Sequence, residues 1–168
     1  AEGLLRAIAL REDGPGILLA GGVRRAAEKL GVQAEQFAVH IKGLETPAWG
    51  PRGATGIALS LMTADRGGCH QRGMPLGEDL GGVPWQGRQV DRLAVTGKAE
   101  IVIHHQNYLA ALDTFVKCDF GTFGLSPATY LKLYHSCTGQ SLEGEEGLQA
   151  LGARIWNMGR LYNLREGI

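Results

Sequence analysis

The sequence predicts an all-α fold, a multihelical and irregular bundle of short helices joined by long Gly/Pro-rich connections. Apolar residues recur at helical spacing in several separate segments, and we expect no convincing β-hairpin. Glycine is abundant, with 26 residues among 168, which favours many short helices over a few long ones. Hydrophobic residues make up 44% of the chain, enough for one domain or for two small lobes, about 1–97 and 98–168.

The N-terminal part of the chain predicts two helices and an extended segment. Leu4–Glu12 has a short helical pattern, which Gly14-Pro15-Gly16 is expected to stop. Ile17–Leu30 is amphipathic, and Gly31 stands where a helix C-cap is expected. Phe37–Lys42 alternates weakly between apolar and polar residues, so we interpret it as extended.

Residues 43–70 form a glycine-punctuated segment that ends in a histidine. A helix is expected over roughly Ala54–Ala64, and the small residues in and before it would let another backbone or a flat ligand come close: Gly53, Ala54, Gly56, Ala58 and Ser60. Gly67 and Gly68 free the turn before His70, which makes His70 a candidate acid–base group. The residues alone favour a simpler interpretation, a histidine that is hydrogen-bonded within a loop.

The second half of the chain predicts a long connection and further helices. Residues 71–97 lack periodicity, and irregular connections of that length are often functional or pack against a partner. Glu100–Lys117 is the predicted central helix, with a buried stripe of Ile101, Tyr108, Leu109, Leu112, Phe115 and Val116. Ser126-Pro127 is a strong start signal for a helix that ends near Cys137. The last helix, near Gly147–Asn163, is expected to bury Leu148, Leu151, Ile155, Met158, Leu161 and Tyr162.

Charge and cysteine content argue against several classes of protein. Lys and Arg together number 17, as do Asp and Glu, so no net charge indicates binding to nucleic acid or to an anionic membrane. No apolar run is long enough for a membrane span, and the N-terminal residues are not a signal peptide. Cys69, Cys118 and Cys137 are odd in number and widely spaced, so we expect a reducing, cytoplasmic setting rather than a disulfide framework.

Asp113 and Cys118 are the second set of candidates. Asp113 falls on or near the apolar side of the central helix, where an unpaired carboxylate would be costly. Five helical steps rotate by about 140°, so both side chains can reach one ligand only if the helix ends between them. The alternatives are a capping or salt-bridged role for Asp113 and a small buried hydrophobe for Cys118. His104-His105 is interpreted as a pair on the helix surface.

Several stretches, taken together, resemble one family. They are REDGPGILLAGGVRRAAEKLG, HIKGLETPAWGPRGATGIALSLMTADRGGCH, ALDTFVKCDF and TGQSLEGEEGLQALGARIWNMGRLYNLREGI. The chain resembles the C-terminal part of the tungsten-containing aldehyde:ferredoxin oxidoreductases over essentially its whole length. The PRG…ADRGGCH and RIWNMGRLYNLREG blocks are the specific ones, and the others support them.

The resemblance implies helical domains that pack on an N-terminal β-rich domain, with a tungsten (or molybdenum) bis-pterin and a 4Fe–4S cluster between them. It implies oxidation of an aldehyde to a carboxylic acid with ferredoxin as the electron acceptor. By resemblance, His70 transfers a proton near the metal, Asp113 contacts the pterin and Cys118 ligates the cluster. The expected partners are the aldehyde, ferredoxin and the protein's own N-terminal domain, with a homodimer as an open alternative.

Departures from the family pattern define the competing hypotheses. Val116-Lys117 stands where the family has Gly-Leu, and Asp119 replaces a residue that is more commonly basic or neutral. We expect the chain to be a fragment that lacks the N-terminal pterin-binding domain and is inactive alone. The alternatives are a cofactor-free helical scaffold or interaction module, and a family member that acts on a different acyl substrate.

Overall fold

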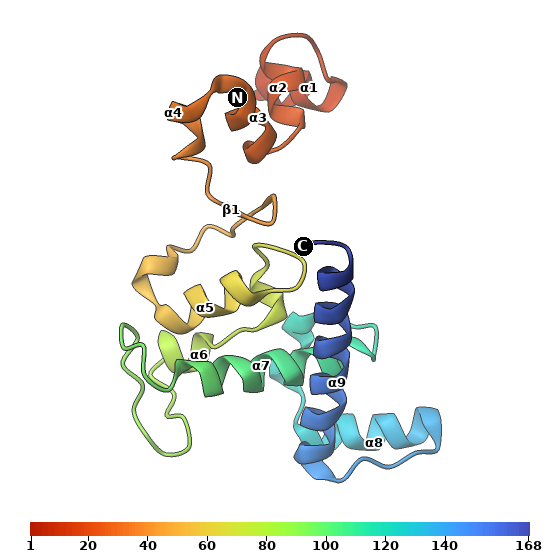
Figure 1. The fold of residues 1–168 in the computed structure, drawn as a ribbon. Helices are drawn as coiled ribbons and strands as arrows, with labels where there is room; N and C mark the ends of the chain where they lie inside the picture. The colour runs from red at the N-terminus through yellow and green to blue at the C-terminus, as the bar shows by residue number, and fades with distance from the viewer. The chain divides into compact units, whose positions relative to one another are not determined.

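The structure is a computed structural model that describes residues 1–168, except for the side chain of Phe123. It is mostly helical, as predicted. The chain divides into two compact units (Figure 1). Unit 1 comprises Ala1–Trp49 and Arg66–Cys69, and unit 2 comprises Gly50–Asp65 and His70–Ile168. The main division therefore falls at Trp49, whereas the sequence left open either one domain or two lobes divided near residue 97.

Unit 1 consists of short helices and one small hairpin. The helices are α1 (Glu2–Leu10), α2 (Pro15–Ala20), α3 (Val23–Leu30) and α4 (Val32–Glu35). The single helix predicted over Ile17–Leu30 is wrong, because the chain breaks at Gly21-Gly22, where Gly22 has φ +85°. Pro15 also begins α2 at its first helical position, so the Gly14-Pro15-Gly16 segment starts a helix as well as ending one.

The predicted absence of a β-hairpin is also wrong. Strand β1 (His40–Ile41) pairs with β2 (Leu44–Glu45) in antiparallel register. Lys42 and Gly43 form the two-residue turn, with φ +52° and +84°. Two successive positive φ values are what a hairpin turn of type I′ requires. The hairpin escaped prediction because its strands are only two residues long.

Unit 2 contains the longer helices of the chain. Its elements are the 3-10 helices η1 (Pro51–Gly53), η2 (His70–Arg72) and η3 (Asp119–Gly124), and the α-helices α5 (Thr55–Thr63), α6 (Leu76–Asp79), α7 (Lys98–Asp113), α8 (Pro127–Thr138) and α9 (Gly144–Arg165). Figure 1 shows α9 crossing α7. At the crossing, a Cβ atom on Gly152 would lie 1.7 Å from the carbonyl oxygen of Asn107, so only glycine allows this approach.

The core of unit 2 confirms part of the predicted apolar stripes. Ile101, Leu109, Leu112 and Leu148 are buried. Val116 is 94% exposed, because α7 ends at Asp113 and does not reach it. Burial of the C-terminal half of α9 was also predicted wrongly, since Met158, Leu161 and Tyr162 are each more than half exposed.

The small residues of α5 are covered by the chain's own 73–79 segment. A Cβ atom on Gly56 would lie 2.7 Å from Oδ2 of Asp79. Ser60 Oγ donates a hydrogen bond to the carbonyl oxygen of Gly73 at 2.6 Å. The helix predicted over Ala54–Ala64 is thus confirmed, and the close approach that its small residues allow is made at these positions by a backbone and a carboxylate. None of the helices in the described part of the chain combines the length and apolar character needed to cross a membrane.

Candidate functional site

The central helix predicted over Glu100–Lys117 ends earlier, at Asp113, so the condition under which Asp113 and Cys118 could reach one ligand is met: the helix ends between them. Helix α7 ends at Asp113, Val116 takes a left-handed conformation with φ +53°, and Cys118 is the extended residue that precedes η3. A β-branched residue rarely adopts positive φ, because Cβ approaches the following carbonyl oxygen. The backbone at Val116 therefore has the conformation that glycine adopts without strain, and glycine is the residue that the family resemblance expects there.

Asp113 is held by a buried arginine that the sequence did not single out. Arg72, the last residue of η2, contacts Oδ2 of Asp113 through Nη1. Its Nε and Nη2 donate to the two carboxylate oxygens of Asp65 at 2.9 and 3.0 Å. Burial alone would lower the pKa of Arg72, but the hydrogen bonds and charges of the two carboxylates raise it instead. The capping or salt-bridged alternative for Asp113 is thus confirmed in its salt-bridged form.

A second carboxyl group lies beside Asp113. Asp119 is buried, with 6% of its surface exposed. Burial raises the pKa of Asp119, and the neighbouring charge of Asp113 raises it further. Lys117 Nζ lies 4.0 Å from Oδ1 of Asp119 and donates a hydrogen bond to Thr122 Oγ1 at 2.6 Å. The positive charge expected at Lys117 is therefore engaged with residues of η3.

His70 reaches the same turn from η2, of which it is the first residue. Its ring is half-buried, and its centroid lies 6.3 Å from that of Phe120 at an interplanar angle of 56°. Phe120 follows Cys118 by two positions. The start of η3 thus brings together all three candidates: Cys118 adjoins it, Asp113 faces Asp119, and His70 packs on Phe120.

Cys118 has an exposed, free thiol, so its predicted alternative as a small buried hydrophobe is wrong. Cys69 is half-buried, and its Sγ accepts a hydrogen bond from Arg66 Nη2 at 2.9 Å. Across the described residues, no three His, Cys, Asp or Glu side chains form a group that could hold a metal ion. A cluster at Cys118 would therefore need its other ligands from outside the described residues.

The histidine pair on α7 is not a surface pair, contrary to the prediction. His105 Nε2 lies 3.1 Å from Oε2 of Glu78, and the His104 ring meets the ring of Trp85 edge-on at 5.0 Å. Burial, together with the charge of His105, lowers the pKa of His104. The pair thus joins α7 to the segment that precedes it. Sequence reasoning missed this role because both partners come from the irregular 71–97 region.

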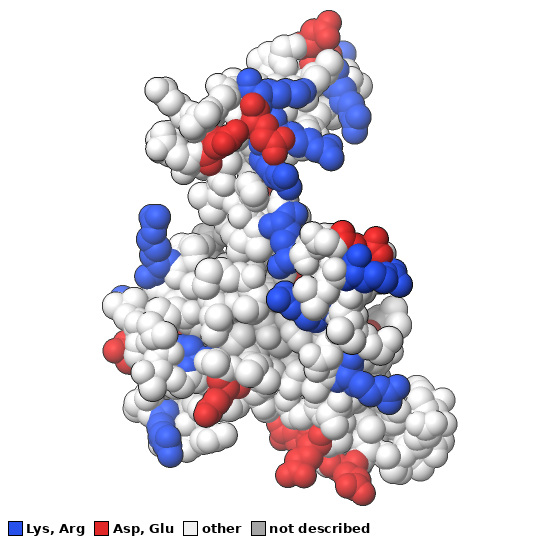
Figure 2. All heavy atoms as spheres, in the orientation of Figure 1, with Lys and Arg blue, Asp and Glu red and all other residues white. Residues whose placement is uncertain are grey.

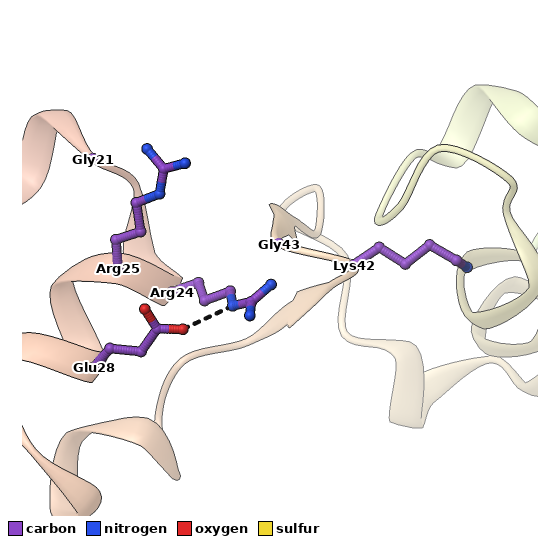
Figure 3. A pocket seen from close by; sticks show the side chains of 6 residues that line it. All are labelled: Gly21, Arg24, Arg25, Glu28, Lys42 and Gly43. Carbon is purple, nitrogen blue, oxygen red and sulfur yellow. Dashed lines mark hydrogen bonds and ion pairs between the residues drawn. The ribbon is translucent and has the colours of Figure 1, made fainter. Parts of the chain in front are cut away.

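Unit 1 contains a cavity with several basic side chains. It has a volume of about 460 Å³ and is lined by Gly21, Arg24, Arg25, Glu28, Lys42 and Gly43. Figure 3 shows Arg24 paired with Glu28, at 2.9 Å, and Lys42 directed away from that pair. Because its cationic groups do not converge, the cavity offers no centre for an anion. In Figure 2, most of the visible face is uncharged, and Lys and Arg side chains are scattered over it together with Asp and Glu.

Known proteins resemble this chain over its whole length. Residues 1–168 match the family model described as aldehyde ferredoxin oxidoreductase, domains 2 & 3. The chain is 36% identical over 158 residues to a tungsten-containing aldehyde ferredoxin oxidoreductase of Pyrococcus furiosus. This alignment covers 94% of this chain and 25% of the relative. It is also 36% identical over 162 residues to that of Thermococcus kodakarensis, with 96% and 26% covered. The chain thus spans about a quarter of the length of these relatives.

Proposed function

Because the chain belongs to the aldehyde ferredoxin oxidoreductase family, in its domains 2 and 3, we propose that it is the C-terminal helical part of a tungsten- or molybdenum-pterin, iron–sulfur oxidoreductase. The reaction is oxidation of an aldehyde to a carboxylic acid, with ferredoxin as the electron acceptor. One observation supports the proposal most strongly: the candidate ligand Cys118, the candidate pterin contact Asp113 and the candidate acid–base group His70 all adjoin the start of η3.

The residues present fit the groups that they would contact. Cys118 presents an exposed thiol, and thiolate is the ligand that iron–sulfur clusters take from proteins. One oxygen of Asp113 contacts Arg72, while the side chain keeps 38% of its surface exposed. The exposed part of this carboxylate can accept hydrogen bonds from amino and ring N–H groups of a pterin. When bound, the two groups would supply a two-electron oxidation and the one-electron transfers to ferredoxin.

His70 is the proposed proton-transfer residue. Conversion of an aldehyde and water to a carboxylic acid releases two electrons and two protons, and a positioned base must take up protons near the substrate carbonyl. A half-buried imidazole beside Phe120 is suited to this role, because an imidazole can both accept and donate a proton. The acid–base proposal applies to the whole protein; the 168-residue chain alone is proposed to be inactive.

Metal analysis of the full-length protein, combined with aldehyde oxidation, tests the proposal. We expect tungsten or molybdenum together with iron, and acid formation with a viologen acceptor, whereas the separate 168-residue chain shows none of these. A full-length protein that contains neither tungsten nor molybdenum, and no iron, would contradict the enzyme proposal. It would favour the helical scaffold instead, an alternative supported by Val116-Lys117, where a valine with φ +53° stands before the candidate ligand.

A further inference from the structure

Arg72 connects two of the proposed site residues that are far apart in sequence. It lies in η2, two positions after His70, and its guanidinium contacts Asp113 on α7. Its partners Asp65 and Asp113 are 7 and 41 residues away in sequence. No other described arginine combines burial with contacts to two carboxylates.

The guanidinium of Arg72 is held in one position by its contacts with Asp65 and Trp156. Two of its nitrogens bind both oxygens of Asp65, at 2.9 and 3.0 Å, and this bidentate arrangement allows only one orientation of the planar group. The plane also lies over the ring of Trp156 on α9, with Cζ 5.4 Å from the ring centroid. The nitrogen that remains, Nη1, is thereby directed at Oδ2 of Asp113.

The backbone of η2 is held in part by the same ion pair between Arg72 and Asp65. A 3-10 helix of three residues has few hydrogen bonds of its own, so contacts from outside the turn must hold it. Gly73, the next residue, packs so closely that a Cβ atom there would lie 2.6 Å from Ser60 Oγ. The turn that carries His70 is therefore fixed on one side by Gly73 and by the side chain of Arg72.

We propose that Arg72 is a positioning residue of the site, which through one guanidinium orients the carboxylate of Asp113 and holds the turn that carries His70. This inference rests on the proposed function, because it assigns Arg72 a role toward the pterin and the substrate. Arg72 contacts Oδ2 of Asp113, and the Asp113 side chain keeps 38% of its surface exposed toward the proposed pterin. Lysine could not replace it, because a single ammonium group cannot bind Asp65 bidentately and reach Asp113 in a fixed plane.

The test compares Arg72→Lys with Arg154→Lys, an exposed arginine of α9, in the full-length enzyme. Tungsten per chain, iron per chain, cluster absorbance, kcat and KM are measured for each. For Arg72→Lys we expect at least a threefold loss of tungsten, and a fall in kcat per tungsten of about tenfold to a hundredfold. Iron and cluster absorbance stay at the wild-type level. A general folding defect would lower iron and tungsten together. A loss of tungsten with unchanged iron therefore identifies a positioning role.

Asp65→Asn serves as a second variant in case Arg72→Lys does not fold. It weakens the ion pair between Arg72 and Asp65 but leaves Arg72 and Asp113 in place. We therefore expect a smaller loss of tungsten per chain, again with iron per chain at the wild-type level. Wild-type tungsten content and kcat in Arg72→Lys, or in Asp65→Asn if the first variant is unfolded, would overturn the inference. A wild-type enzyme that contains no tungsten, molybdenum or iron would refute the proposed function itself. If the wild type contains these metals and the variants match it in metal content and kcat, only the inference about Arg72 fails.

Discussion

Lys98 and Asp79 form an ion pair in the interior of unit 2, where neither residue exposes more than 4% of its surface. The second oxygen of Asp79 accepts a hydrogen bond from the backbone N–H of Ile57 at 3.0 Å. One carboxylate therefore caps the N-terminal turn of α5 and neutralises the charge of Lys98, the first residue of α7. Gly56 permits this arrangement, because any larger residue would collide with the carboxylate.

The Lys98–Asp79 pair predicts a large loss of stability when one partner is removed. Lys98→Met should lower the free energy of unfolding of the 168-residue chain by about 3–5 kcal/mol, because it leaves the carboxylate of Asp79 buried without a counter-charge. Urea unfolding measures the change. Lys132→Met, at an exposed position of α8, is the control and should stay within about 0.5 kcal/mol of the wild type. Equal stability of the two variants would contradict the prediction.

The crossing of α7 and α9 predicts that Gly152 tolerates no side chain. Gly152→Ala would place Cβ 1.7 Å from the carbonyl oxygen of Asn107, so the helices must separate. We expect a loss of about 3 kcal/mol or more, at the upper end of the cost of overpacking. Gly159→Ala in the same helix meets nothing nearer than 3.4 Å and should be neutral or stabilising by up to about 1 kcal/mol. Thermal unfolding of both variants tests the contrast, which disappears if α9 is not packed on α7.

Local sequence signals predicted several elements of unit 2 correctly. Ser126 accepts a hydrogen bond from the backbone N–H of Thr129, as the capping pattern indicated, and α8 ends at Thr138, next to the predicted end near Cys137. In these cases the residues that determine the structure lie within a few positions of one another.

Long-range contacts could not be predicted in the same way. Arg72 has no sequence feature that distinguishes it from the other arginines, because its carboxylate partners are brought to it by α7 and by the turn after α5. The same is true of Lys98 with Asp79, since a predicted helix start gives no reason to bury a lysine. The exposed Met158 illustrates the converse, because a helical stripe indicates an apolar face but not what covers it.

The exposed thiol at the start of η3 predicts a selective loss of iron. Cys118→Ser in the full-length protein should lose the visible absorbance of the cluster and lower iron per chain, because serine does not replace a thiolate ligand well. Cys137→Ser, at another exposed free cysteine, should leave both unchanged. Absorption spectra and iron analysis of the two variants provide the measurement. An intact spectrum in Cys118→Ser would remove Cys118 from the proposed site.

The Glu78–His105 contact predicts that the free energy of unfolding depends on pH in the acid range. Burial alone would raise the pKa of Glu78, but the hydrogen bond and charge of His105 lower it below its ordinary value of 4.5. The unfolded chain therefore binds this proton more readily, so the stabilisation is complete above about pH 4.5 and is lost as the pH falls through the folded-state pKa. Glu78→Gln should flatten the fall in unfolding free energy over this acid range. The exposed Glu146→Gln serves as the control, and equal slopes in both would argue against the contact.

The left-handed backbone of Val116 predicts a substitution that stabilises the chain. Val116 is 94% exposed, so Val116→Gly removes almost no buried surface, while it relieves a conformation that costs a side chain about 1–2 kcal/mol. Glycine also makes the unfolded chain more flexible, at a cost of about 0.5–1 kcal/mol. We therefore expect a net gain of up to about 1 kcal/mol in the free energy of unfolding, measured with urea. Val95→Gly, at a position that is 81% exposed and has no positive φ, should lose about 0.5–1 kcal/mol. If both valine variants lost stability equally, the turn before Cys118 would not require a left-handed residue, and the family's glycine there would need a different explanation.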